Sequence, residues 1–202
     1  VFSDQYFYGL RMYNTEDVKV RGNKVKTTGS SSYAFTFGDI DEFEISGNET
    51  NGGNYGLYMD GANKTGAPVR SLLVNNMFIG DKYGIYFKSS KNFNIYHNSV
   101  FGTDRGIHME GNFNKNFDMV NNIVSTDLGE AIHTTHVPSN ALYDYNVYYT
   151  NSSGNAFEFG SNSYSTLNSW KTAVTGINDS SLFGDPVFQA ADDLRINLGT
   201  IA

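Results

Sequence analysis

The feature that most constrains this chain is a four-residue pattern (small, apolar, variable, apolar) that recurs at nearly constant spacing. Its seven copies begin at residues 9, 34, 56, 84, 106, 131 and 156, so successive starts lie 25, 22, 28, 22, 25 and 25 residues apart. The first two are Gly9-Leu10-Arg11-Met12 and Ala34-Phe35-Thr36-Phe37, and Thr134 is the one departure from the pattern. Alternation with period two indicates a strand with one buried face. One such unit cannot bury that face alone, so the copies must stack on one another.

A column of asparagines supports the repeat. It consists of Asn23, Asn48, Asn76, Asn98, Asn122 and Asn146. Each follows an alternating pair, as Phe93 and Ile95 precede Asn98, and each is followed two residues later by another inward candidate, such as Val100. Asn tolerates left-handed backbone, and stacked Asn amides can hydrogen-bond along an axis. We therefore expect two or three short strands per repeat, with a structural Asn at one corner.

Helical and sandwich folds explain this pattern less well. Helical spacing of apolar residues is absent before about Thr166, and Gly and Asn interrupt every candidate window. A sandwich predicts short strands with frequent turns, but not the same residue classes recurring in register. Parallel stacking of similar coils does predict this recurrence, with a rise of about 4.8 Å per coil.

The motif Asn-x-apolar followed by Gly-Ile, as in Asn98-Ser99-Val100 with Gly106-Ile107, resembles the right-handed parallel β-helix family with pectate-lyase-type repeats, of the secreted bacterial type. The resemblance covers about residues 9–160. It implies an all-β fold, a single-stranded right-handed parallel β-helix (a solenoid) of about seven coils. We assign residues 1–160 to the coils and residues 161–202 to a C-terminal helix and capping segment.

The C-terminal segment breaks the repeat. Ser165 or Thr166 can cap a short helix that carries Leu167 and Trp170 on one side. The apolar stretches 182–188 and 194–196 follow, and we expect this tail to cover the unpaired strand edges of the last coil. No equivalent cap precedes the first coil, so we expect a fragment of a longer protein whose neighbouring domains are its partners.

Charge and composition exclude several classes of protein. Lys and Arg number 14 against 21 Asp and Glu, a formal charge of −7, which disfavours nucleic acids and anionic membranes as partners. No apolar run is long enough to span a bilayer. The chain has no Cys, which excludes disulfides, thiol nucleophiles and thiolate metal sites. Abundant Asn, Gly, Ser, Thr and Tyr are typical of a secreted β-rich protein, so we expect a secreted or cell-surface location.

The outward positions of the strongest strand suggest a binding surface. They are Arg11, Thr36, Tyr58, Tyr86, His108, His133 and Glu158, and the next outward positions include Asp60, Lys88 and Glu110. Stacking makes an exposed stripe of rings flanked by charges, which suits a polysaccharide. The predicted glycan-contacting residues are Tyr58, Tyr86, His133, Arg105 and Glu158. The alternative is that Tyr and His only stabilise the outer face by stacking across strands.

Two routes of glycan cleavage use the same face. Hydrolysis needs two carboxylates about 5–10 Å apart, and Asp60 and Glu110 lie two coils apart with Lys88 between them; Asp104, Glu110 and Glu130 offer another pairing. Elimination needs a base, for which Lys88, Arg105, His108 and Tyr86 are candidates. We therefore predict Lys88, His108, Glu110 and Asp60 as catalytic residues. The acidic net charge counts against a polyuronate substrate, and the paired-Asp motifs of the polygalacturonase branch are missing.

Metal sites are a weaker prediction. His108 and His133 occupy one column, His136 follows in the same turn, and Glu110 is near, a set that suits a divalent metal. A calcium site from Asp39, Asp41 and Glu42 is weaker still, because regularly spaced oxygen ligands are absent. No tight spacing supports either set, so no metal ligand is assigned and Ca²⁺ is named only as a candidate cofactor.

Two function classes follow from these residues. The first is an extracellular β-helix module that contacts polysaccharide along an outer strand face, as a polysaccharide lyase, a glycoside hydrolase or a binding protein without catalysis. The second is a non-catalytic structural or adhesin module of a large cell-surface protein. The absence of a catalytic signature leaves enzymatic activity open.

Overall fold

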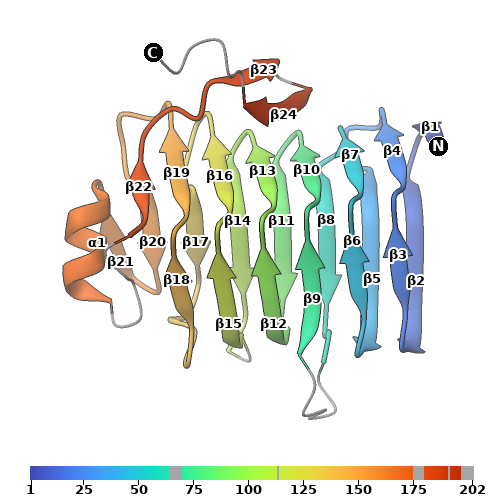
Figure 1. The fold of residues 1–202 in the computed structure, drawn as a ribbon, viewed down its shortest axis with the longest axis horizontal. Coiled ribbons are helices and arrows are strands. Elements are labelled where there is room, and N and C mark those ends of the chain that lie inside the picture. The colour runs from blue at the N-terminus through green and yellow to red at the C-terminus, as the bar shows by residue number, and fades with distance from the viewer. Residues whose placement is uncertain (64–69, 113, 175–179, 191, 197–202) are drawn as a thin grey trace.

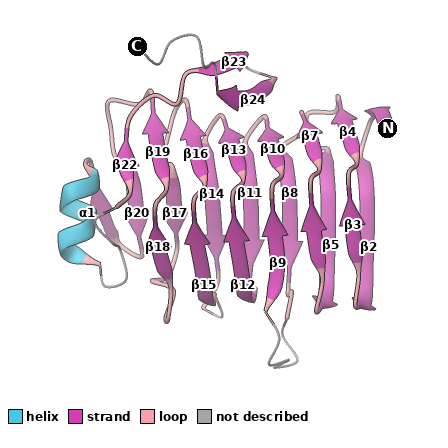
Figure 2. Cartoon of the chain, viewed as in Figure 1, coloured by secondary structure: helices cyan, strands magenta, loops and turns pink. Residues whose placement is uncertain are grey.

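The computed structural model describes residues 1–63, 70–112, 114–174, 180–190 and 192–196. Within these residues the chain winds into a stack of rungs, with one short helix at the C-terminal end of the stack (Figure 1). Strands make up most of the ordered structure (Figure 2). No helix among the described residues is long and apolar enough to cross a membrane.

Three sheets run along the stack. Sheet A contains, in spatial order, β1 (Phe2–Gln5), β4 (Lys24–Thr27), β7 (Glu49–Asn51), β10 (Met77–Gly80), β13 (Ser99–Gly102), β16 (Ile123–Thr126), β19 (Val147–Thr150) and β22 (Leu182–Phe183). Sheet B contains β2 (Tyr8–Glu16), β5 (Tyr33–Asp41), β8 (Tyr55–Asp60), β11 (Tyr83–Lys88), β14 (Arg105–Glu110), β17 (Ile132–Thr134), β20 (Phe157–Phe159) and β21 (Asn162–Tyr164). Sheet C contains β18 (Leu142–Asp144), β15 (Lys115–Val120), β12 (Lys91–Tyr96), β9 (Ser71–Val74), β6 (Glu44–Ser46) and β3 (Lys19–Arg21).

Every third strand in sequence is therefore a neighbour in space. All pairs within the three sheets are parallel except β20 with β21, which is antiparallel. Sheet C holds six strands, so the described residues form about six complete turns, and sheet B holds the seven parallel strands that the seven repeats predict. The expected parallel β-helix is confirmed.

The solenoid core lies between the three sheets and consists of like residues stacked from rung to rung. Ile85 pairs in register with Ile107, and Ile107 pairs with Ile132. All three side chains are fully buried, as are the predicted inward residues Phe93 and Val100. Strict register matters because a slip of one residue would turn every apolar side chain to the solvent.

The predicted asparagine ladder is present at the corner between sheets C and A. The side-chain oxygen of Asn98 accepts hydrogen bonds from the backbone and side-chain nitrogens of Asn76, at 3.0 and 2.9 Å. Asn98 in turn donates both groups to the side-chain oxygen of Asn122, each at 3.0 Å. The left-handed backbone conformation occurs at the residue that precedes each ladder asparagine, for example His97 with φ 56°, and not at the asparagine itself. The ladder Asn itself stays free to point inward.

The C-terminal segment closes the stack in part as predicted. Helix α1 (Leu167–Ala173) is capped by Thr166, whose hydroxyl accepts from the Ser169 amide at 3.1 Å, and it buries Leu167 and Trp170. Trp170 stacks on Phe157 of the last parallel strand of sheet B, with ring centroids 4.2 Å apart.

Beyond the helix, β22 pairs with β19 in sheet A and so covers an open strand edge of the last coil, as expected. The hairpin of β23 (Phe188–Ala190) and β24 (Asp193–Ile196) then turns back along the solenoid, where β24 contacts β13 (Figure 1). The predicted segment 194–196 therefore lies against the side of the solenoid.

Candidate functional site

The outer face of sheet B presents three columns of side chains, because parallel register places equivalent residues of successive rungs next to one another. The central column is Thr36, Tyr58, Tyr86, His108, His133 and Glu158. The tyrosine column, one side of it, is Tyr8, Tyr33, Tyr55 and Tyr83, followed by Arg105. The rim column, on the other side, contains Asp60, Lys88 and Glu110. The structure thus places the predicted glycan-contacting residues and the four predicted catalytic residues on one face of sheet B.

The rings of the central column stack on one another as predicted. The centroids of Tyr58 and Tyr86 are 5.2 Å apart, those of Tyr86 and His108 4.7 Å, and those of His108 and His133 4.7 Å. The expectation of an exposed row of rings is wrong for three of them, since Tyr86, His108 and His133 are only 8%, 4% and 6% exposed. Each ring covers the face of the next, so their faces are not open to a ligand.

The tyrosine column is a feature that the sequence reasoning missed. Tyr33 and Tyr55 stack with centroids 4.7 Å apart, and both meet the ring of Tyr58 edge-on at 5.4 Å. The guanidinium of Arg105 continues the column over the ring of Tyr83 at 5.7 Å. The signal is visible in the repeat, because a Tyr directly precedes the small residue in four of the seven copies. This column is the second reason that the central rings are covered.

The rim column pairs its charges internally. Lys88 Nζ lies 3.4 Å from Asp60, and the Tyr58 hydroxyl donates to Asp60 at 3.3 Å. The Tyr86 hydroxyl donates to Glu110. Lys88 and Glu110 remain about half exposed, so the rim is the part of this face that a solvent-borne ligand meets first.

The hydroxyls of Tyr55 and Tyr86 remain protonated donors at ordinary pH. Burial raises the pKa of Tyr55 to about 12, with its tyrosine neighbours adding to the effect. Burial likewise raises the pKa of Tyr86, and the hydrogen bond to Glu110 raises it further. A tyrosine with a raised pKa is a poor general base, which counts against Tyr86 in that role.

His108 is a neutral imidazole held by charged neighbours. Burial lowers its pKa to about 3, and the nearby His133 and Arg105 lower it as well. Arg105 Nη1 lies 3.4 Å from His108 Nδ1. A guanidinium only donates, so Nδ1 accepts and the proton resides on Nε2, which faces Glu110 Oε2 at 3.8 Å.

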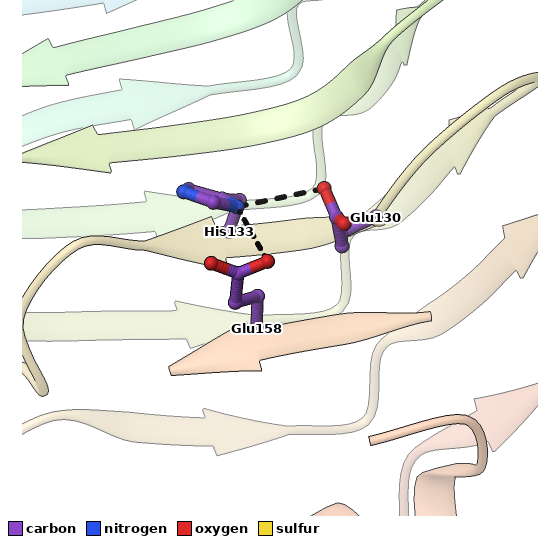
Figure 3. A group of neighbouring side chains, drawn as sticks. All are labelled: Glu130, His133 and Glu158. Atoms are coloured by element: carbon purple, nitrogen blue, oxygen red, sulfur yellow. Dashed lines mark ion pairs between the residues drawn. The ribbon is translucent and has the colours of Figure 1, made fainter. Parts of the chain in front are cut away.

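At the C-terminal end of the central column, three side chains converge (Figure 3). His133 lies on β17, Glu158 on the neighbouring strand β20, and Glu130 in the turn that enters β17. One donor atom from each lies within 4.8 Å of the other two. His133 Nδ1 is 3.5 Å from a carboxylate oxygen of Glu130 and 3.5 Å from one of Glu158.

The imidazole nitrogen at the centre of this group has no hydrogen-bond partner. His133 Nδ1 is inaccessible to solvent, and its 3.5 Å separations from the two carboxylates are ion-pair contacts without hydrogen-bond geometry. A buried polar atom without a partner is costly. A cation between the imidazole and the two carboxylates would satisfy this nitrogen.

Electrostatics keep Glu130 ready to bind a cation. Burial alone would raise the pKa of Glu130, but His133 and the Arg105 guanidinium, whose Nε lies 3.1 Å from its carboxylate, hold that pKa at about 2. The side chain of Glu158 is 29% exposed, so the group is reachable from solvent on that side. Glu130 is therefore a carboxylate at neutral pH, with Arg105 offsetting part of its charge.

The donor set suits a transition metal. Imidazole nitrogen and carboxylate oxygen bind Zn²⁺ or Cu²⁺ at about 2.0–2.2 Å, so ligands of one ion lie up to about 4 Å apart. The 3.5 Å separations of His133 Nδ1 from the two carboxylates meet this requirement, and the two carboxylate oxygens lie within 4.8 Å of each other.

This group differs from the metal sets considered from the sequence. Of His108, His133, His136 and Glu110, only His133 belongs to it; His136 is exposed and contacts the Thr135 hydroxyl at 3.2 Å. Among the described residues, the candidate calcium ligands Asp39, Asp41 and Glu42 form no such group. In the sequence, the repeats are aligned from their small residue onward. Glu130 directly precedes the small residue Ala131, so that alignment does not include it as a metal ligand.

One family model matches this chain, over residues 3–184, and its description is periplasmic copper-binding protein (NosD). The match includes all three residues of the converging group. No curated protein and no solved structure matches the chain.

Proposed function

Since this chain belongs to the NosD family of proteins described as periplasmic and copper-binding, we propose that it is an extracellular β-helix module that holds a divalent copper ion on the outer face of sheet B. The β-helix architecture and the secreted or cell-surface location agree with the family. The copper ligands of the proposal are Glu130, His133 and Glu158, called the His133 site below.

The observation that carries the proposal is the unpartnered Nδ1 atom of His133 between two carboxylates. In the divalent series, sites of nitrogen and oxygen ligands bind Cu²⁺ more tightly than the ions before it and Zn²⁺ after it. A single imidazole with two carboxylates belongs to this class of site. Solvent would complete the coordination through the side on which Glu158 is exposed.

Charge supports the binding of a dication. The two carboxylates are only partly neutralised by Arg105, and the chain as a whole has a formal charge of −7. A bound Cu²⁺ would supply a Lewis-acid and redox centre. The residues of this chain bind and orient that ion, and the 29% exposure of Glu158 leaves it accessible to an exchange partner.

The test is a titration of the metal-free protein with Cu²⁺, followed by calorimetry and by electron paramagnetic resonance. We expect one ion per chain, with a spectrum that shows one coordinated nitrogen. His133→Ala and Glu158→Gln should each weaken binding by roughly 100-fold or more, because loss of an outer partner alone costs about 10–100-fold.

His136→Ala and Glu16→Gln are the matched controls, since both residues are exposed and outside the site. They should bind Cu²⁺ like the unmodified protein. Absence of a copper signal in that protein, or unchanged affinity in His133→Ala, would refute the proposal.

The rim column supports a second candidate function, contact with a polysaccharide. Lys88 and Glu110 are about half exposed and lie beside the hydroxyls of Tyr58 and Tyr86, an arrangement of donors and acceptors that suits sugar hydroxyls. Because the ring faces are covered, such contact would use ring edges and hydroxyl groups.

A glycan array with product analysis tests for polysaccharide contact and distinguishes binding alone from cleavage. Binding that is lost in Lys88→Ala supports glycan contact, and products that disappear in Glu110→Gln support cleavage with Glu110 and Asp60 as the carboxylates. Binding without products supports a non-catalytic module. Absence of any glycan binding would leave the structural or adhesin role.

A further inference from the structure

The ligand chemistry around the His133 site is restricted to nitrogen and oxygen. The sequence contains no Cys, so no thiolate is available anywhere in the chain. The group itself offers one imidazole and two carboxylates. Softer ligands would have to come from methionine thioethers.

The methionines lie away from this face. The five are Met12, Met59, Met77, Met109 and Met119. Three of them, Met59, Met109 and Met119, are fully buried in the solenoid core, and Met12 packs partly buried against it. Met77 lies on sheet A, where it lines a groove with Lys24 and Glu49.

Sheet B itself separates the nearest sulfur column from the site. Met109 pairs in register with Thr134, and both side chains are buried on the inner face. His133, one residue before Thr134, points to the opposite face because side chains alternate along a strand. The thioether of Met109 therefore cannot reach an ion at His133 without breaking the sheet.

From this placement we propose that the His133 site retains copper as Cu²⁺ and releases it when the ion is reduced to Cu⁺. The inference rests on the proposed function. Cu⁺ is a soft ion that prefers thiolate and thioether ligands, whereas Cu²⁺ accepts imidazole and carboxylate. Reduction also halves the charge that Glu130 and Glu158 attract, so both chemistry and electrostatics favour the divalent ion.

The step balances with one electron and no group transfer. A one-electron reductant of the ascorbate class would give its electron to bound Cu²⁺, and the ion would leave as Cu⁺ while Glu130 and Glu158 remain carboxylates. Nδ1 of His133 would return to the unbound state that the structure shows. The site thus serves as a store that opens under reducing conditions.

The affinities of the two oxidation states provide the direct test on the unmodified protein. Cu²⁺ is titrated against a chromogenic chelator in air, and Cu⁺ against a Cu⁺-specific chelator without oxygen. We expect Cu²⁺ to bind at least 100-fold more tightly than Cu⁺. Since a tenfold ratio of affinities corresponds to 59 mV for one electron, the reduction potential of the bound ion should lie about 120 mV or more below that of free copper. Equal affinities within tenfold would overturn the inference.

Release is followed separately by reduction of the copper-loaded protein under anaerobic conditions. The paramagnetic signal should disappear, and the copper should pass through a filter that retains the protein. Loss of the signal with copper retained would also overturn the inference, while leaving the proposed function intact. Failure to bind Cu²⁺ at the outset would remove both.

The variant His133→Met tests the role of the ligand type, since it replaces the imidazole with a thioether at the same position. We expect the preference for Cu²⁺ over Cu⁺ to narrow by at least tenfold. His136→Met, on the exposed turn after β17, is the control and should leave the ratio unchanged. If His133→Met does not fold, the affinity ratio of the unmodified protein still decides the question.

Discussion

His133 and Glu158 hold the same register position on neighbouring strands, and Nδ1 of the first lies 3.5 Å from a carboxylate oxygen of the second. They are 25 residues apart in the chain, so the contact exists only when two rungs are stacked. Any ion bound between them connects the last two rungs of sheet B. Ion binding and stacking of these rungs are therefore thermodynamically linked.

Cu²⁺ should stabilise the folded chain through this linkage. At a free concentration 100 times the dissociation constant, a ligand of the native state adds about 2.7 kcal/mol to the free energy of unfolding. We expect a rise in Tm that a chelator reverses, measured by thermal denaturation. The same rise in His133→Ala would show that copper binds elsewhere.

The pH dependence of stability should contain a contribution from His108. Burial lowers its pKa to about 3 in the folded chain, against 6.5 for the free side chain. Below pH 6.5 His108 is therefore protonated in the unfolded chain but not in the folded chain, and the free energy of unfolding falls as the pH decreases toward 3.

Urea denaturation between pH 7 and pH 4 measures this contribution. His108→Gln should show a flatter decline than the unmodified protein, and the exposed His136→Gln should not. A decline of equal slope in His108→Gln and in the unmodified protein would contradict the assignment.

The asparagine ladder should make Asn98→Ala strongly destabilising. Its side chain accepts two hydrogen bonds from Asn76 and donates to the Leu73 carbonyl at 3.0 Å, all in a buried corner. Each orphaned group costs about 1–3 kcal/mol, so we expect a loss of roughly 3 kcal/mol or more in chemical denaturation. Asn168→Ala, at an exposed helix position, should cost little, and similar losses in both variants would argue against the ladder.

Gly84 should not tolerate a side chain. A Cβ atom there would lie 2.4 Å from Cγ1 of Val100 and 2.8 Å from the carbonyl oxygen of Phe101. Gly84→Ala should therefore lower stability by about 1–3 kcal/mol through overpacking. Gly184→Ala meets no atom within 4 Å and serves as the control in the same denaturation assay. An undiminished Tm for Gly84→Ala would contradict this close approach of sheets B and A.

Trp170 should report on the C-terminal end of the stack. It is the single Trp of the chain, it is fully buried, and it stacks on Phe157. We expect blue-shifted fluorescence in the native state and a loss of about 3–5 kcal/mol in Trp170→Ala. Leu128→Ala, at an exposed position, is the control. Native emission at the wavelength of free tryptophan would mean that the helix does not cover the rung.

Much of the architecture was predictable because a solenoid repeats a local pattern. The alternation around Ile107 and the recurrence of Asn98 with its equivalents predict the strands, the inward file and the ladder, and the structure confirms them. The path of the β23–β24 hairpin was not predictable, since non-repeating segments choose among available surfaces and edges by tertiary contacts.

The candidate site, too, was predictable only in part from the sequence. The amino-acid sequence by itself determined the rung pattern, the outward column from Tyr58 to Glu158 and the exclusion of thiolate ligands by the absence of Cys. Only the tertiary structure decided that the rings of His108 and His133 are covered, and that Glu130 reaches His133 from a turn outside the column. The physical reason is that register along a strand follows from period-two burial, whereas the exposure of a ring and the direction of a turn depend on neighbours many residues away.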